Sequence, residues 1–154
     1  MTYTSRPVAP FKVDILSTSN PSSYAANQKI PFTGTPKNTS AAVSSGQITV
    51  YEGSNWKIEY SAVFQGHPTT GACQYEIQLY SVTDGAYIGQ SAWATAPSYN
   101  NARKGRVVAS ALILSSEIST SKVIEARIVS QSQMADPTYN CYGKPTLRVM
   151  ELPT

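Results

Sequence analysis

Apolar and polar residues alternate one by one along residues 56–65, whose sequence is WKIEYSAVFQ. One side of this segment collects Trp56, Ile58, Tyr60, Ala62 and Phe64, and the other collects Lys57, Glu59, Ser61 and Gln65. Successive side chains of a β-strand point to opposite faces of its sheet, so the pattern predicts a strand with one face in a core. No stretch of the chain shows a convincing helical repeat. The clearest pattern in the sequence therefore favours a fold built from half-buried strands.

Other short apolar stretches follow at close intervals, separated by turn signals such as Asp84-Gly85. We expect further strands at residues 11–16, 29–33, 47–51, 73–82, 87–95, 106–114, 122–130 and 146–152. Pro31 interrupts the second of these segments and predicts an edge strand there. The best helix candidate, residues 114–125, is broken by serine and β-branched residues and is rejected. Many short strands without helices between them predict an all-β sandwich or barrel.

Composition fits one folded domain and excludes several other classes. The chain has 154 residues, of which 41% are hydrophobic and 14% charged. Its apolar content can support a core, which argues against disorder, and it lacks the composition of a coiled coil. No apolar run approaches the ~20 residues of a membrane-spanning helix, so we expect no membrane partner. The net charge of +3 is mild, and its tightest basic group, Arg103, Lys104 and Arg106, is too sparse to predict a nucleic-acid partner.

The N-terminal residues are polar, contain prolines and lack the apolar run of a secretory signal, so we expect a protein made in the cytoplasm. We interpret residues 1–27 as an extended arm and loop with one short β segment, and residues 28–154 as the sandwich domain. Cys73 and Cys141 are interpreted as buried free thiols. A disulfide would need their Cα atoms within about 7 Å, and the sequence leaves that distance open.

Two predicted strands are apolar on both faces. In residues 106–114, one face carries Val108, Leu112 and Leu114, and the other carries Val107, Ala109, Ala111 and Ile113. Residues 146–152 place Leu147 and Val149 opposite Met150 and Leu152. A sandwich strand has only one core face, so the second face needs a cover, either another subunit or residues 11–16 or a long loop folded over it. We predict a subunit interface made of Val107, Ala109, Ala111, Ile113, Arg148, Met150 and Leu152.

The order and lengths of the segments resemble a jelly roll of the tumour-necrosis-factor/C1q-like superfamily, in the reduced form seen in phage structural proteins. The resemblance rests on KIPFTGTPKNTSAAVSSGQITVYEGSNWKIEYSAVFQG, YEIQLYSVTDGAYIGQS, RVVASALIL and TLRVMEL, and it covers about residues 28–152. It implies a two-sheet antiparallel jelly-roll sandwich. It also implies a homotrimer in which one sheet of each subunit, carrying residues 56–65, 106–114 and 146–152, faces the threefold axis.

The chain lacks a collagen-like Gly-X-Y stalk and a membrane anchor, which argues against complement-like and cytokine roles. The resemblance therefore implies a trimeric capsid decoration (cement) protein of a phage virion, with the major capsid protein as partner. The alternative is a receptor-binding knob of a fibre or tail needle that recognises a host glycan or protein. Expected capsid contacts in the arm are Tyr3, Arg6, Val8 and Phe11, and expected recognition tyrosines are Tyr80, Tyr99, Tyr139 and Tyr142.

The residue patterns of common enzymes and metal sites are missing from the sequence. The single histidine, His67, lies in a Gly-His-Pro loop, and no nucleophile motif such as G-x-S-x-G occurs. Its spacing to Cys73 and Cys141 matches no zinc pattern. The nine acidic residues are dispersed and form no calcium loop. We therefore predict a protein without enzymatic activity and without a cofactor.

Overall fold

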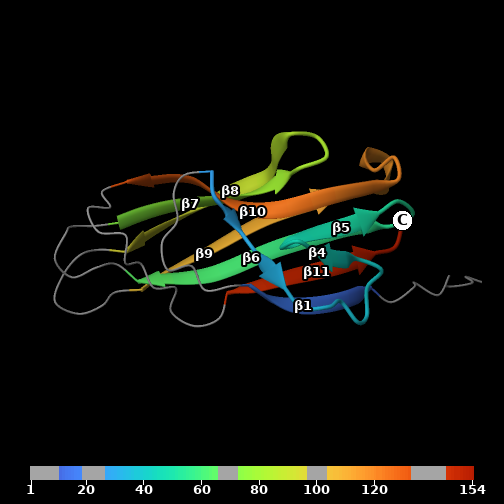
Figure 1. Ribbon diagram of the computed structural model, residues 1–154, viewed down its shortest axis with the longest axis horizontal. Coiled ribbons are helices and arrows are strands. Elements are labelled where there is room, and N and C mark those ends of the chain that lie inside the picture. The colour runs from blue at the N-terminus through green and yellow to red at the C-terminus, as the bar shows by residue number, and fades with distance from the viewer. Residues whose placement is uncertain (1–10, 19–26, 66–72, 97–103, 133–144) are drawn as a thin grey trace, which may run out of the picture.

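The computed structural model describes residues 11–18, 27–65, 73–96, 104–132 and 145–154 (Figure 1). The regular secondary structure of this part of the chain is all strand apart from a single 3-10 turn, η1 (Ser115–Glu117). The strands are β1 (Lys12–Thr18), β2 (Lys29–Ile30), β3 (Phe32–Thr33), β4 (Ala42–Ser44), β5 (Gln47–Tyr51), β6 (Asn55–Gln65), β7 (Cys73–Ser81), β8 (Ala86–Ala96), β9 (Lys104–Ile113), β10 (Ser121–Ser132) and β11 (Thr146–Leu152).

The strands pair antiparallel and lie in two layers that are continuous along one side. We call the run β3-β1-β11-β6-β9 sheet A and the run β8-β7-β10-β5-β4 sheet B, in which β2 also pairs with β10. The two sheets join where Gln90 of β8 pairs with Ser110 of β9. In Figure 1 the long strands of both layers follow the long axis of the molecule. This arrangement confirms the predicted two-sheet antiparallel jelly roll.

The core fills the space between the sheets, and β6 supplies its largest side chains. Trp56, Ile58 and Tyr60 are fully buried, as the alternation in the sequence predicted. Sheet B contributes the fully buried aliphatic residues Ile48, Val50, Ile77, Leu79, Ile124 and Ile128 to the same core. Aromatic rings from one sheet therefore pack on branched aliphatic side chains from the other, as in other sandwiches.

Each segment predicted as a strand contains one, with small shifts at the ends. The rejected helix at residues 114–125 is replaced by η1 and the first part of β10. The strand β4 was missed, because its three residues lie in an Ala/Ser-rich stretch without alternation. Pro31 divides residues 29–33 so that β2 pairs with sheet B and β3 pairs with β1 of sheet A. Figure 1 shows this short piece crossing from one layer to the other.

A bulge in β8 lets it serve both sheets. The pairing of β8 with β7 shifts between Ile77 and Leu79, and the extra residues of β8 lie at Gly89 and beyond. Gly89 has a φ of 68°, and a Cβ atom there would lie 2.1 Å from the carbonyl oxygen of Ser110. Only glycine permits this conformation and this approach of two backbones. The junction between the sheets therefore depends on a residue without a side chain.

The short β segment that we predicted near the N-terminus is a strand of the sandwich. We expected residues 1–27 to be an extended arm and loop with one short β segment, and that segment, β1, lies within sheet A and pairs with β11 from Lys12 to Ser17. Asp14 and Leu16 of this strand are buried. Sheet A therefore includes β1, and the predicted division of the chain at residue 28 stays a prediction.

Candidate functional site: the outward face of sheet A

The predicted assignment of the two faces of β9 is wrong. We expected Val107, Ala109, Ala111 and Ile113 on an outward interface, but all four lie in the core with exposures of 3% or less. The register on β6 gives the reason, since Ala109 lies opposite Tyr60 and Ile113 lies opposite Trp56. Residues opposite one another in a sheet share a face, so the inward aromatics of β6 fix which side of β9 is buried. The small alanines leave room for these rings.

The outward face of β9 consequently carries the other apolar set. Val108, Leu112 and Leu114 are exposed by 48%, 59% and 43%. On the far side of the sheet, Ile15 of β1 is exposed by 69% and Phe11, just before β1, by 61%. β1 extends sheet A at its edge beside β11, so residues 11–16 do not cover this face as one explanation required. Large apolar side chains at both sides of one sheet face are unusual for a protein that remains alone in water.

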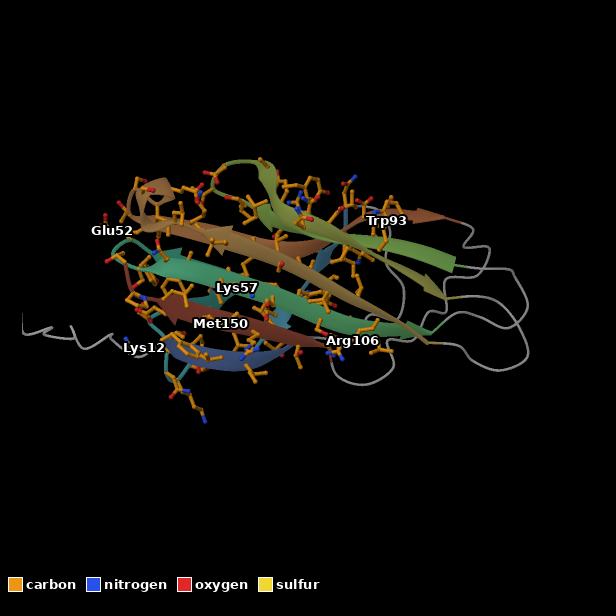
Figure 2. All side chains as sticks on the ribbon, turned by 180° about the vertical axis from the view of Figure 1, so that it is seen from behind. Lys12, Glu52, Lys57, Trp93, Arg106 and Met150 are labelled. Atoms are coloured by element: carbon orange, nitrogen blue, oxygen red, sulfur yellow. The ribbon has the colours of Figure 1, made fainter. Side chains whose placement is uncertain are left out.

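A polar column on β6 and β11 separates the two apolar groups. The Lys57 ammonium forms an ion pair with one carboxylate oxygen of Glu59 at 2.8 Å. A guanidinium nitrogen of Arg148 lies 3.9 Å from the other carboxylate oxygen of Glu59. At one end of the sheet Arg106 donates to the hydroxyl of Ser61 at 3.3 Å. Figure 2 shows Lys57 and Met150 in the middle of this face and Arg106 toward one end. Lys57 and Arg148 against Glu59 make the column basic, and Arg106 of β9 adds a further cation at its end.

The predicted interface residues of β11 alternate with the core residues Leu147 and Val149 and so lie on the outward face. Arg148 is exposed, Leu152 is half-buried, and Met150 is nearly covered by its neighbours. Met150 lies between Val13 and Lys57 in the register of β1, β11 and β6. The part of these residues in a subunit interface stays a prediction.

Several predicted residues lie outside the described part of the chain. They are Tyr3, Arg6, Val8, His67, Tyr99, Tyr139, Cys141 and Tyr142. Cys73 begins β7, but its side chain also lies outside the described set, so its pairing with Cys141 stays open. Of the expected arm contacts only Phe11 is described, and of the recognition tyrosines only Tyr80.

Tyr80 belongs to a network on the outward face of sheet B that the sequence analysis missed. The Arg127 guanidinium stacks on its ring, with the Cζ atom 3.4 Å from the centroid, and Tyr87 meets it edge-on with centroids 5.2 Å apart. Beneath the guanidinium, the buried Glu125 binds Arg127 and accepts from the Gln47 amide at 2.7 Å. These residues come from β5, β7, β8 and β10, so only the strand order could bring them together.

Two carboxylates on β1 and β11 bind the segment between β3 and β4. Asp14 accepts from the backbone N–H groups of Lys37, Asn38 and Thr39 and from the Thr39 hydroxyl. Burial by itself would raise the pKa of Asp14, but these hydrogen bonds stabilise the charged form and lower it to about 2. For Glu151, burial likewise opposes ionisation, yet the N–H of Ser40, the hydroxyl of Ser54 and nearby Lys12 lower its pKa.

Within the described ranges, no group of three or more His, Cys, Asp or Glu residues could hold a metal ion. The same ranges contain no helix with the length and hydropathy needed to cross a bilayer. The exposed apolar face of sheet A is therefore the feature of this part of the chain that most needs a functional explanation.

Comparison with known proteins shows the fold. No protein-family model and no curated protein matches the chain. The crystal structure of murine APRIL at pH 5.0 is similar with a TM-score of 0.60 and 8% identity, covering 93% of this chain and 100% of that one. The crystal structure of murine APRIL at pH 8.0 has a TM-score of 0.54 and 11% identity, covering 93% of this chain and 100% of that one. The structure of Eiger TNF from S. frugiperda has a TM-score of 0.51 and 8% identity, covering 94% of each chain. At such identities the likeness shows a TNF-like jelly roll and nothing finer.

Proposed function

We propose that this protein is a non-enzymatic structural protein of a phage virion, a homotrimer that decorates the capsid and bridges neighbouring coat subunits. The observation that carries the assembly part is the exposed apolar surface of sheet A, formed by Val108, Leu112 and Leu114 on one side and Ile15 on the other. A patch of about 400 Å² would contribute roughly 10 kcal/mol on burial at about 25 cal/mol/Å², before the costs of association.

The division of the face into two apolar groups favours a ring of copies. In face-to-face pairing of two identical sheets, the basic columns around Arg148 and Lys57 would oppose each other. In a ring, the β9 side of one copy meets the β1 side of the next, so Leu112 packs near Ile15 of its neighbour. Such a head-to-tail contact closes when the rotation between copies is right, and a trimer is the smallest common ring of this kind.

The proposed capsid contact belongs to the N-terminal residues. β1 is committed to its own sheet, which leaves Phe11 and the residues before it to reach a coat protein. Exposed Phe11 is one candidate anchor, together with Tyr3, Arg6 and Val8. Three arms on one trimer engage three equivalent sites, and this multivalency slows dissociation without any new contact. The place of action on this proposal is the capsid surface, after synthesis in the host cytoplasm.

The assembly part is tested by light scattering on purified protein. Leu112→Glu should convert a species of three chains into a monomer, because it places a charge in the proposed contact. Val82→Glu is the matched control, since Val82 is also exposed, by 40%, but lies on the β7–β8 hairpin away from sheet A. A wild-type protein that is monomeric at high micromolar concentration would rule out the trimer.

The ring geometry is tested with cysteines. Ile15→Cys combined with Leu112→Cys should give covalent trimers on mild oxidation, whereas each single variant should give none. Leu112→Cys alone forming dimers would instead indicate face-to-face pairing. The native cysteines are replaced by serine in all of these variants.

The capsid part is tested by co-sedimentation with virus particles. Deleting residues 1–11 should leave a folded trimer that no longer sediments with particles. Particle binding equal to that of the intact chain would remove the arm from the mechanism.

The second candidate function, a receptor-binding knob, is favoured by the network around Tyr80 and Arg127. Tyrosine and arginine are enriched among residues that dominate binding interfaces, and this pair is held rigidly by Glu125 and Tyr87. Binding to a host glycan or surface protein that is lost in Arg127→Ala, without any binding to capsids, would favour the knob over the decoration protein.

A further inference from the structure

The segment at residues 34–41, which we call the strap, links the two sheets along their open side. It begins after β3 of sheet A and ends before β4 of sheet B. Gly34 at its start has a φ of 111°, a conformation that favours glycine, and Ala41 at its end is buried. The strap therefore begins at a glycine with a positive φ and ends at a residue that is buried in the core.

Four consecutive backbone N–H groups of the strap point at carboxylates of sheet A. Those of Lys37, Asn38 and Thr39 donate to Asp14 at 3.0, 3.1 and 2.8 Å. That of Ser40 donates to Glu151 at 2.8 Å. Successive N–H groups turned to one side form a concavity that binds anions, and here two side chains of the same chain occupy it.

The strap also covers backbone at the free side of β1. β11 takes one edge of this strand, and β3 pairs with the other edge only at Ser17 and Thr18. Further along that second edge, the Asn38 side-chain amide donates to the carbonyl oxygen of Val13 at 3.2 Å. The uncovered edge of a sheet is a template on which another strand can add, so proteins usually block it.

The contacts that hold the strap come from beneath. Lys37, Asn38 and Ser40 of the strap are exposed. On the side that faces sheet A, the Thr39 hydroxyl of the strap donates to the Asp14 carboxylate of β1. Asp14 alone accepts from three strap residues, so the loss of its charge removes several bonds together. A neutral amide at the same position has only one acceptor oxygen and would turn a donor toward other donors.

We propose that the strap is a detachable guard of the β1 edge, held closed by Asp14 and Glu151, and that its release lets β1 pair with a strand of a second copy. This contact would differ from the one proposed for the face of sheet A, because it uses backbone hydrogen bonds at the edge. It does not depend on the proposed function.

Hydrogen exchange at neutral pH tests the release of the strap. Asp14→Asn should raise amide exchange at residues 37–40 by about tenfold or more, while β7 and β10 keep their protection. Asp84→Asn is the matched control, because Asp84 holds the β7–β8 hairpin and lies on the other sheet. It should leave exchange in the strap unchanged. Unchanged exchange at residues 37–40 in a folded Asp14→Asn protein would overturn the proposal.

A milder variant covers the case in which Asp14→Asn does not fold. Thr39→Val keeps the charge and the N–H donors and removes only the hydroxyl that donates to Asp14 at 2.7 Å. It should raise exchange in the strap several-fold with the rest of the domain unchanged. Exchange equal to that of the wild type would count against the guard.

The edge contact is measured in a Leu112→Glu background, in which association through the face of sheet A is removed. Asp14→Asn added to this background should produce concentration-dependent dimers or larger species in light scattering. Asn38→Ala, which uncovers the carbonyl of Val13 but leaves the backbone N–H groups in place, should produce fewer. A double variant with an open strap that stays monomeric would refute pairing at the edge. If Leu112→Glu alone associates as the wild type does, the proposal for the face fails and the guard is judged by hydrogen exchange.

Discussion

Thr39 donates two hydrogen bonds to the same carboxylate oxygen of Asp14, one from its backbone N–H at 2.8 Å and one from its hydroxyl at 2.7 Å. The two residues are 25 positions apart in the chain, and their contact fixes the strap to β1 of sheet A. Because the pKa of Asp14 falls from an ordinary 3.8 to about 2, the folded protein favours its ionised form. Part of the stability of the protein in acid should therefore depend on this carboxyl.

The first prediction concerns pH. Above about pH 4 the lowered pKa of Asp14 contributes fully to stability, and this contribution falls as pH drops toward 2 and disappears below it. With allowance for solvent near the strap, we expect a loss on the order of 1–2 kcal/mol in the free energy of unfolding. Urea unfolding at a series of pH values measures it. Asp14→Asn should lack this part of the acid dependence, and an unchanged profile in that variant would contradict the assignment.

The second prediction concerns the ion pair between Lys122 and Asp84. The Lys122 ammonium is largely buried and lies 2.8 Å from Asp84, whose pKa is lowered by hydrogen bonds from Lys122 and Ser81. Removing the acid leaves a buried cation without its partner, whereas Lys122→Met removes the charge that needs one. Asp84→Asn should therefore destabilise the protein more than Lys122→Met does. Equal losses of stability in chemical denaturation would contradict this prediction, because they would show that an unpaired buried cation carries no extra cost.

The third prediction concerns the junction of the sheets. Gly89→Ala places a methyl group against the Ser110 carbonyl in a conformation with positive φ. We expect a loss of about 2 kcal/mol or more, because neither backbone can move without breaking the link between β8 and β9. Gly53→Ala is a suitable control, since Gly53 also has a positive φ of 90° but its Cβ would meet no atom within 4 Å. Similar thermal stability for the two variants would contradict the importance of close approach.

The fourth prediction separates the two faces of β9. Ala109→Leu inserts a larger side chain into the core opposite Tyr60 and should cost about 1–3 kcal/mol of stability. Leu112→Gln, on the outward face, should leave the stability of the subunit nearly unchanged and weaken association. Chemical denaturation and light scattering on both variants measure the two effects. The reverse outcome would restore the original assignment of the faces.

The fifth prediction concerns salt. Copies that gather through sheet A bring together Lys57, Arg106 and Arg148 against a single Glu59 in each, so the charges repel on balance. Sodium chloride screens such repulsion, with a Debye length of about 10 Å at 0.1 M. Association should therefore tighten several-fold as salt rises, and Arg148→Gln should reduce this dependence. Dissociation on adding salt would mean that attractive ion pairs dominate the contact.

The type of fold and the positions of most strands could be predicted from local patterns in the chain. Alternation from Trp56 to Ala62 identified β6, an interior strand of sheet A, and its core face, because side chains in a strand repeat every two residues. Turn residues such as Asp84-Gly85 identified where strands end, because they favour the backbone angles of tight turns. These signals are local, so they are visible without the rest of the chain.

The buried side of β9, the place of β1 within sheet A and the role of the isolated carboxylates became visible only in the folded chain. Val107 and Val108 are equivalent by sequence, and pairing with β6 alone makes one a core residue and the other a surface residue. Asp14 is one of nine dispersed acids in the sequence, and its role appears only where three N–H groups of the strap donate to it. Both outcomes depend on contacts between distant segments, and such contacts arise from the register and order of strands rather than from any local pattern.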